Sequence, residues 1–115
     1  MKVRRAFEFE AAHRLPRHPG ACRRMHGHSY RLVVTVDRPV DPASGMAIDF
    51  GDLKEIVRRE AVSKLDHRDV GEILENPTAE AMAVWVWQQL VGALPGLCEV
   101  EIFETRSCSV VYRGE

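Results

Sequence analysis

Apolar and polar side chains alternate along two stretches near the start of the chain. In residues 3–13 the apolar side chains and one histidine fall on odd-numbered positions: Val3, Phe7, Phe9, Ala11 and His13. After a loop rich in proline and arginine, residues 26–38 repeat the pattern on one parity: His26, His28, Tyr30, Leu32, Val34 and Val36. A period of two residues indicates a half-buried strand. Both stretches are therefore predicted to be strands with histidines on their apolar faces.

The middle of the chain changes to a helical period. Residues 50–67 place apolar side chains close to one stripe of a helix, and Asp49 before them is a suitable N-cap. The stripe consists of Phe50, Leu53, Ile56, Val57, Ala61 and Leu65. A second helix is predicted where Asn76 can act as N-cap and Pro77 suits the first helical position. It ends at one of the glycines that follow its apolar run.

Two further strands are predicted at residues 98–107 and 108–114, which complete the order ββααββ. The chain has 115 residues, of which 45% are hydrophobic, and this is enough for one core of ordinary size. We therefore expect residues 1–115 to form a single domain of the α+β class.

The charge balance limits the possible partners, and the cysteines indicate the cellular compartment. Sixteen basic residues face seventeen acidic ones, so no overall field would hold nucleic acid or an anionic membrane. No segment approaches the roughly 20 apolar residues that cross a bilayer. Three widely spaced cysteines do not resemble a disulfide framework. The protein is expected to be cytoplasmic, with no nucleic-acid or membrane partner.

Three histidines are predicted to lie together. His13 ends the first strand, and His26 and His28 begin the second on one face, because residues two apart in a strand point the same way. Three imidazoles leave the fourth tetrahedral position of a zinc ion open, as in catalytic sites. The alternative is a pair of ordinary surface histidines, and the matching position of His13 makes that alternative weaker.

Cys22 stands in the loop segment "CRRMHGHSY", beside Arg23 and Arg24. Neighbouring cations and a nearby metal favour the thiolate over the thiol. Cys22 is therefore a candidate acid/base group or nucleophile. The alternative is a passive small hydrophobic residue, the usual role of a free cysteine.

Two carboxylate positions also suggest chemistry. Asp66 and His67 are adjacent at the predicted end of the first helix, where a histidine can transfer protons near neutral pH. Simple capping or solvated charge is the alternative. Glu104 shares the parity of apolar residues and so must be paired or bind something. It can accept two parallel N–H bonds, either from an arginine or from an amino-pyrimidine ring.

Six segments of the chain resemble the 6-pyruvoyltetrahydropterin synthase family. They are "FEFEAAHRLP", "CRRMHGHSY", "GMAIDFGDLK", "LDHRDV", "ENPTAEAMAVWVW" and "ETRSCSVVYRGE". The resemblance covers nearly the whole chain and is strongest to the bacterial branch that forms a 6-carboxytetrahydropterin in the queuosine pathway. It implies a tunnelling fold, with a four-stranded antiparallel sheet and two helices on one face. It also implies a homo-oligomeric ring, a hexamer or a similar assembly, which would cover the sheet edges.

The resemblance also implies roles for individual residues. His13, His26 and His28 would hold Zn²⁺, and Cys22 would transfer protons. Asp66 and His67 would form a relay with that thiol from a neighbouring subunit. Pterin contacts would come from Glu104 and, more weakly, from Thr78 and Thr105. Four arginines could bind the triphosphate because of their position in the loop: Arg14, Arg17, Arg23 and Arg24.

The implied reaction converts 7,8-dihydroneopterin triphosphate to 6-carboxy-5,6,7,8-tetrahydropterin, with release of triphosphate and acetaldehyde. A first alternative is a 6-pyruvoyltetrahydropterin synthase, which eliminates triphosphate and retains the side chain. A second is a non-catalytic oligomer that binds zinc and a pterin. Cys22, His67 and an open fourth zinc position argue against the second alternative, because a structural site needs none of them.

Overall fold

A long antiparallel hairpin forms the centre of the structure, a computed structural model that describes all residues from 1 to 115. Strands β1 (Lys2–His13) and β2 (His26–Asp37) pair along their full length. The register runs from Lys2 opposite Asp37 to His13 opposite His26. The predicted alternation is confirmed, since Phe7, Phe9 and Ala11 are buried on one face of β1.

The sheet has five strands in the order β3-β1-β2-β4-β5. Strands β4 (Leu97–Phe103) and β5 (Ser109–Tyr112) extend the antiparallel part beyond β2. The fifth strand, β3 (Arg68–Asp69), pairs in parallel with Ala11 and Ala12 of β1. The predicted four-stranded antiparallel sheet is therefore wrong in this detail. Two residues are too few to produce an alternating pattern, so only tertiary pairing reveals β3.

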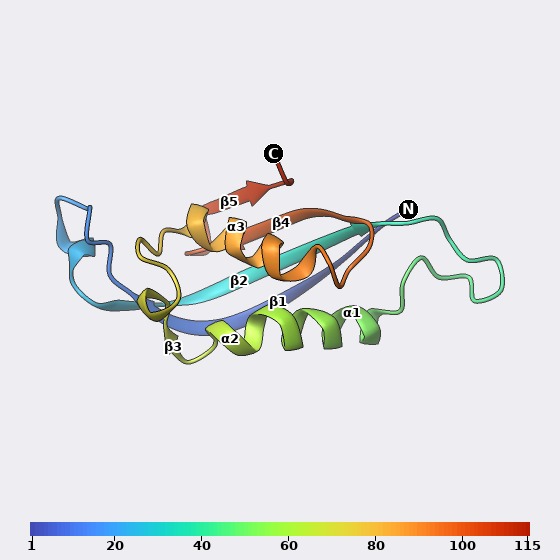
Figure 1. Cartoon of the computed structure of the whole chain (residues 1–115), viewed down its shortest axis with the longest axis horizontal. Coiled ribbons are helices and arrows are strands. Elements are labelled where there is room, and N and C mark those ends of the chain that lie inside the picture. The colour runs from blue at the N-terminus through green and yellow to red at the C-terminus, as the bar shows by residue number, and fades with distance from the viewer.

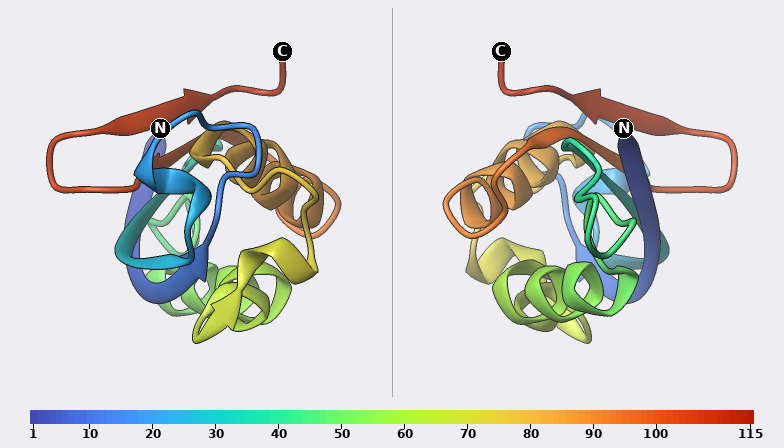
Figure 2. Two further views of the ribbon diagram at one scale, coloured as in Figure 1. Left: turned by 90° about the vertical axis from the view of Figure 1, so that its left-hand side faces the viewer. Right: turned by 90° about the vertical axis from the view of Figure 1, so that its right-hand side faces the viewer.

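Both helical segments lie on the same face of the curved sheet (Figure 2). Helix α1 (Phe50–Val57) is capped by Asp49, as predicted, which accepts hydrogen bonds from Gly51 N and Asp52 N. A π-helical turn (Arg58–Val62) joins α1 to α2 (Ser63–Leu65). The predicted stripe is buried, or partly buried at Ile56, except at its start, where Phe50 is 61% exposed.

Helix α3 (Ala79–Leu90) begins later than predicted. Thr78 is its N-cap, and the threonine side chain accepts a hydrogen bond of 3.1 Å from Ala81 N. Asn76 and Pro77 therefore precede the helix, and the prediction of Asn76 as N-cap is wrong. Both Asn and Thr suit this position, so propensity alone did not separate them. This later start leaves the Pro77 carbonyl outside the helix, where it contacts His13.

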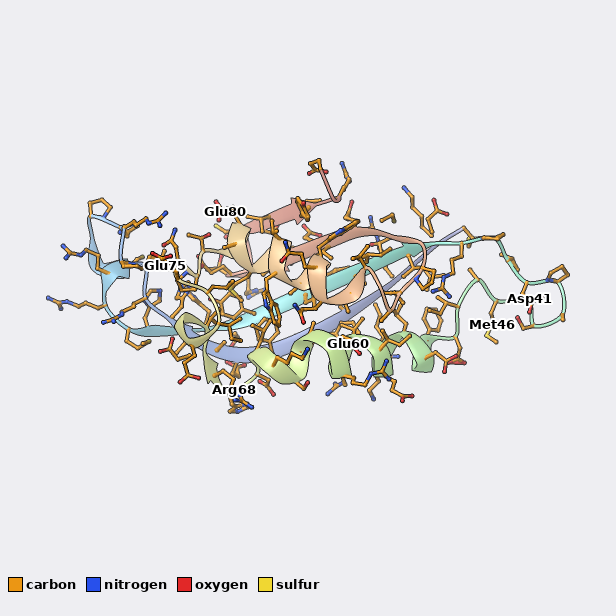
Figure 3. The ribbon with its side chains drawn as sticks, viewed as in Figure 1. Asp41, Met46, Glu60, Arg68, Glu75 and Glu80 are labelled. Atoms are coloured by element: carbon orange, nitrogen blue, oxygen red, sulfur yellow. The ribbon has the colours of Figure 1, made fainter.

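Loops extend from the two ends of the elongated molecule (Figure 1). The loop between β1 and β2 includes a short 3-10 turn, η1 (Ala21–Arg23), and joins His13 to His26. Asp41 and Met46 lie near the tip of the loop at the opposite end (Figure 3). A second 3-10 turn, η3 (Val70–Glu72), follows β3. None of the helices is both long enough and apolar enough to span a membrane.

We predict that Gly96→Ala destabilises the fold at the turn that leads into β4. Gly96 has a φ of +88°, and a Cβ atom there would lie 2.6 Å from the Asp37 carbonyl oxygen. The left-handed conformation alone costs about 1–2 kcal/mol for a residue with a side chain, and the clash adds to this cost. Urea denaturation should show the loss in the free energy of unfolding.

Gly92→Ala is the matched control, because a Cβ atom at Gly92 meets nothing within 4 Å. Its free energy of unfolding should stay the same or rise slightly, since alanine reduces the freedom of the unfolded chain. A Gly96→Ala variant as stable as the wild type would contradict the turn geometry.

Candidate metal centre and surrounding groups

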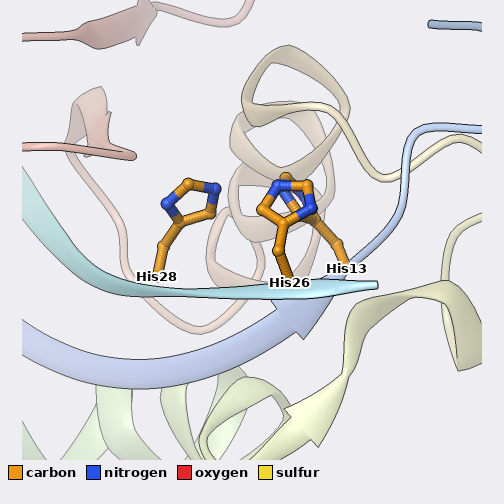
Figure 4. A group of neighbouring side chains, drawn as sticks. All are labelled: His13, His26 and His28. Carbon is orange, nitrogen blue, oxygen red and sulfur yellow. The ribbon is translucent and has the colours of Figure 1, made fainter. Parts of the chain in front are cut away.

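Three imidazole rings converge at one end of the β1–β2 hairpin (Figure 4). One nitrogen from each of His13, His26 and His28 lies within 4.8 Å of the other two. The register produces this arrangement, because His13 pairs with His26 and His28 follows on the same face of β2. The structure thus brings together the three residues that the sequence analysis selected, and the cluster could hold a metal ion.

The tautomers of two histidines are set by backbone carbonyls. His13 Nδ1 lies 2.8 Å from the Pro77 oxygen, and His26 Nδ1 lies 2.7 Å from the Arg24 oxygen. A carbonyl can only accept, so each Nδ1 must carry a hydrogen. In the neutral rings, each Nε2 then presents a lone pair, and the two Nε2 atoms are only 3.0 Å apart. Two lone pairs at this distance repel unless a cation or a proton lies between them.

His28 supplies the third nitrogen without a protein partner. Its Nε2 atom is buried and has no hydrogen-bond partner. Burial lowers the pKa of His28 from its ordinary value; Glu104 opposes this shift, whereas His13 and His26 add to it. A lowered pKa keeps the ring neutral, which is the form that binds metals. An unpartnered buried nitrogen beside two converging lone pairs fits a metal ion.

Glu104 lies at the edge of this cluster, directly after β4. Its Oε1 atom is 3.6 Å from His13 Nε2 and 3.9 Å from His28 Nε2. The side chain is 30% exposed, so one side of the carboxylate remains open to solvent. The parity prediction placed Glu104 on the buried face, and the structure has it there. The alternative of an internal pair with an arginine is not observed, because the groups within 4 Å of the Glu104 carboxylate are the ring nitrogens of His13 and His28.

The loop between β1 and β2 carries the candidate thiol and the cations. Cys22 is half-buried and free, and its carbonyl accepts a hydrogen bond of 2.7 Å from Leu15 N. Arg23 and Arg24 have exposed side chains. Arg17 lies 3.9 Å from Glu75 across an exposed ion pair. The thiol thus lies in the loop that joins His13 to His26, but it does not belong to the histidine cluster.

The side chains of Asp66 and His67 lie in contact beside β1. His67 Nδ1 lies 2.9 Å from Asp66 Oδ1, which accepts a bond of 3.0 Å from Glu10 N. The main chain of His67 donates to the Glu10 oxygen at 2.6 Å, and its φ of 59° is the only positive value outside glycine. Such a left-handed residue is uncommon and is often found at functional sites.

The Asp66–His67 pair and the histidine cluster lie on different sides of the hairpin. His67 is 79% exposed and lines an open hollow of about 480 Å³. Glu10 and Ser29, which alternate with the buried residues of β1 and β2, line the same hollow. Arg68, beside this hollow, lies at the sheet edge (Figure 3). His28 of the cluster also lines this hollow, although its side chain alternates with that of Ser29 and so belongs to the opposite face of β2.

The two threonines suggested for pterin contacts lie apart from each other in the fold. The Thr78 oxygen accepts a hydrogen bond as the α3 N-cap, one residue after the Pro77 that contacts His13. Thr105 is exposed and lines a hollow of about 400 Å³ together with Glu8 and Arg31. Thr78 is thus close in sequence to the cluster, whereas Thr105 belongs to the opposite face of the sheet.

Sequence reasoning missed the groups that support the histidines. Tyr30 is fully buried, and its hydroxyl oxygen lies 3.2 Å from His13 Nδ1. Its parity with His26 and His28 was the available signal, but Tyr30 was assigned only to the apolar face. The Pro77 carbonyl had no signal, because it comes from a segment 64 residues away from His13.

Comparisons with known proteins identify relatives of this chain. The model of the family described as 6-pyruvoyl tetrahydropterin synthase matches residues 2–115. The 6-carboxy-5,6,7,8-tetrahydropterin synthase of Synechocystis is 42% identical over 117 residues, covering 96% of this chain and 91% of the relative. The human 6-pyruvoyl tetrahydrobiopterin synthase is 37% identical over 99 residues, covering 78% of this chain and 67% of the relative.

A solved structure extends the likeness to the whole fold. The 6-pyruvoyl tetrahydropterin synthase of Caenorhabditis elegans superimposes with a TM-score of 0.90 at 28% identity. The superposition covers 100% of this chain and 96% of that structure. The sequence and structural matches together show that this chain belongs to the 6-pyruvoyl tetrahydropterin synthase family.

Proposed function

We propose that this protein is a zinc-dependent lyase that converts 7,8-dihydroneopterin triphosphate to 6-carboxy-5,6,7,8-tetrahydropterin. Triphosphate and acetaldehyde would be the other products, and the reaction would serve queuosine biosynthesis in the cytoplasm. The single observation that carries the proposal is the convergence of His13, His26 and His28 beside Glu104. The relative from Synechocystis, at 42% identity over nearly the full chain, supports the choice of product.

Zinc bound by the three histidines would supply Lewis acidity toward the substrate hydroxyls. The chain's own groups have distinct roles in this proposal. Cys22 removes and returns a proton on the substrate side chain. Glu104 accepts two N–H bonds from the amino-pyrimidine edge of the pterin. Its partly exposed carboxylate suits this role, because a ligand can reach it without displacing core residues.

The Asp66–His67 pair is proposed to act with Cys22 of a neighbouring subunit. His67 is 79% exposed and does not belong to the histidine cluster of its own chain, so its ring is accessible to another copy. Asp66 Oδ1 lies 2.9 Å from His67 Nδ1 and would orient the ring, which leaves Nε2 available for proton transfer. Joining sheets edge to edge would complete the site and cover the free edges of β3 and β5.

A 6-pyruvoyltetrahydropterin synthase is the second candidate. The human relative at 37% identity and the close superposition on the Caenorhabditis elegans structure favour it. Both candidates use the same zinc ligands and the same thiol, and they differ in whether the two-carbon unit is lost. The product of the reaction therefore distinguishes them.

Product analysis tests the proposed reaction. The purified, zinc-loaded protein is incubated with 7,8-dihydroneopterin triphosphate, and the pterins are identified by mass spectrometry. We expect 6-carboxy-5,6,7,8-tetrahydropterin together with acetaldehyde, and loss of turnover after the metal is removed with a chelator. A 6-pyruvoyl product would assign the protein to the second candidate. Unchanged substrate would favour a protein that binds a pterin without catalysis.

Replacing the thiol tests its role separately from metal binding. Cys22→Ala should lower turnover by about 100-fold or more, as expected when a group that transfers protons is removed. Zinc content should stay equal to that of the wild type, because Cys22 is outside the histidine cluster. Cys98→Ala is the control, since Cys98 contacts the Thr35 carbonyl on β2 and not the site. Full activity in Cys22→Ala would refute the assigned role.

A mixing experiment tests whether neighbouring subunits share one site. Cys22→Ala and His67→Ala are each expected to be inactive alone. When the two variants are unfolded together and refolded, some sites combine an intact Cys22 with an intact His67 from another chain. Turnover should therefore reappear in the mixed assembly. If both groups came from one chain, the mixture would stay as inactive as its components.

A further inference from the structure

Tyr30 lies directly behind two of the three histidines. It follows His28 by two residues on the same face of β2 and is fully buried. Its ring is nearly perpendicular to that of His13, with centroids 6.1 Å apart, and to that of His28, with centroids 5.5 Å apart. On its other side it stacks on Phe9 at a centroid distance of 5.1 Å. Tyr30 thus connects the metal-site histidines to the hydrophobic core.

The hydroxyl group of Tyr30 points to the nitrogen of His13 that faces away from the cluster. The Oη atom is 3.2 Å from His13 Nδ1, and the Pro77 oxygen is 2.8 Å from the same nitrogen. Because the carbonyl requires a hydrogen on Nδ1, the Tyr30 oxygen acts as a second acceptor for it. Two acceptors on Nδ1 keep the Nε2 lone pair directed toward the cluster.

Packing alone does not explain this hydroxyl group. Phe9 and Leu32, which pair with or follow Tyr30 on the same face, are apolar and buried. A phenylalanine ring would fill the same space, and a buried hydroxyl without a partner lowers stability. His13 Nδ1 is the hydrogen-bond partner that Tyr30 Oη has in the structure. The polar atom is therefore accounted for by the metal-site histidine.

We propose that Tyr30 is a positioning residue of the metal site. Its hydroxyl group, together with the Pro77 carbonyl, holds His13 in the tautomer and ring orientation that direct Nε2 toward the ion. The inference rests on the proposed binding of a metal by the three histidines. Groups that hold the outer nitrogen of a ligating histidine typically change metal affinity by about 10- to 100-fold when they are removed.

The test is Tyr30→Phe in the full chain, which removes one oxygen and keeps the ring. Zinc and cobalt affinities are measured by competition with a chelator of known affinity. We expect Tyr30→Phe to bind both metals about 10-fold more weakly or worse. Tyr112→Phe makes the same chemical change at a hydroxyl that donates to the Glu115 carbonyl, so its metal affinity should equal that of the wild type.

A second control separates the hydroxyl group from general loss of stability. Leu32→Val shortens a buried side chain two residues beyond Tyr30 on the same face. It should lower the unfolding temperature of the metal-free protein and leave metal affinity unchanged. Equal or tighter binding by Tyr30→Phe would overturn the inference, as would an equal loss of affinity in Leu32→Val.

Metal binding by the wild type and by His28→Ala distinguishes a failure of this inference from a failure of the proposed function. If the wild type binds zinc and His28→Ala does not, the metal site stands, and the affinity of Tyr30→Phe alone decides the role of the hydroxyl group. If the wild type binds neither metal, or if His28→Ala binds as well as the wild type, the proposed metal site and this inference both fail.

Discussion

The pairing register of β1 and β2 is the constraint on which the rest of the site depends. His13 lies opposite His26, and this pairing places His28 and Tyr30 next along the same face. A slip of one residue would turn the side chains of one strand to the opposite face of the sheet. The register is strongly determined, because the same slip would expose Phe7 and Phe9 to solvent. The hydrophobic core and the histidine cluster are therefore specified by one interaction.

The site also depends on two segments that lie outside the hairpin. The Pro77 carbonyl reaches His13 because α3 begins at Ala79 and leaves the preceding residues in an extended turn. Glu104 reaches the histidines from the end of β4. Both segments pack on the hairpin through apolar contacts, so the geometry of a polar cluster is held by hydrophobic burial. This support preorganises the histidines before any ligand binds.

The local alternation of side chains was visible in the sequence, whereas backbone pairing between distant segments was not. Strand alternation identified the shared face of His13, His26 and His28, because a period of two residues is a local property. The parity of Glu104 was equally visible. The two-residue strand β3 and the left-handed His67 were not, because each depends on backbone bonds to β1 across more than fifty residues. The N-cap of α3 was misplaced because Asn76 and Thr78 have similar propensities.

The sequence by itself determined which side chains share a face and which ones carry chemistry, since these properties depend on residue type and on spacing along a strand or helix. Tertiary structure decided what each histidine nitrogen contacts and on which side of the sheet His67 lies. Those features arise from carbonyl groups and chain crossings, and a carbonyl group is the same in every residue. A pattern of side chains therefore cannot predict that the carbonyl groups of Pro77 and Arg24 orient His13 and His26.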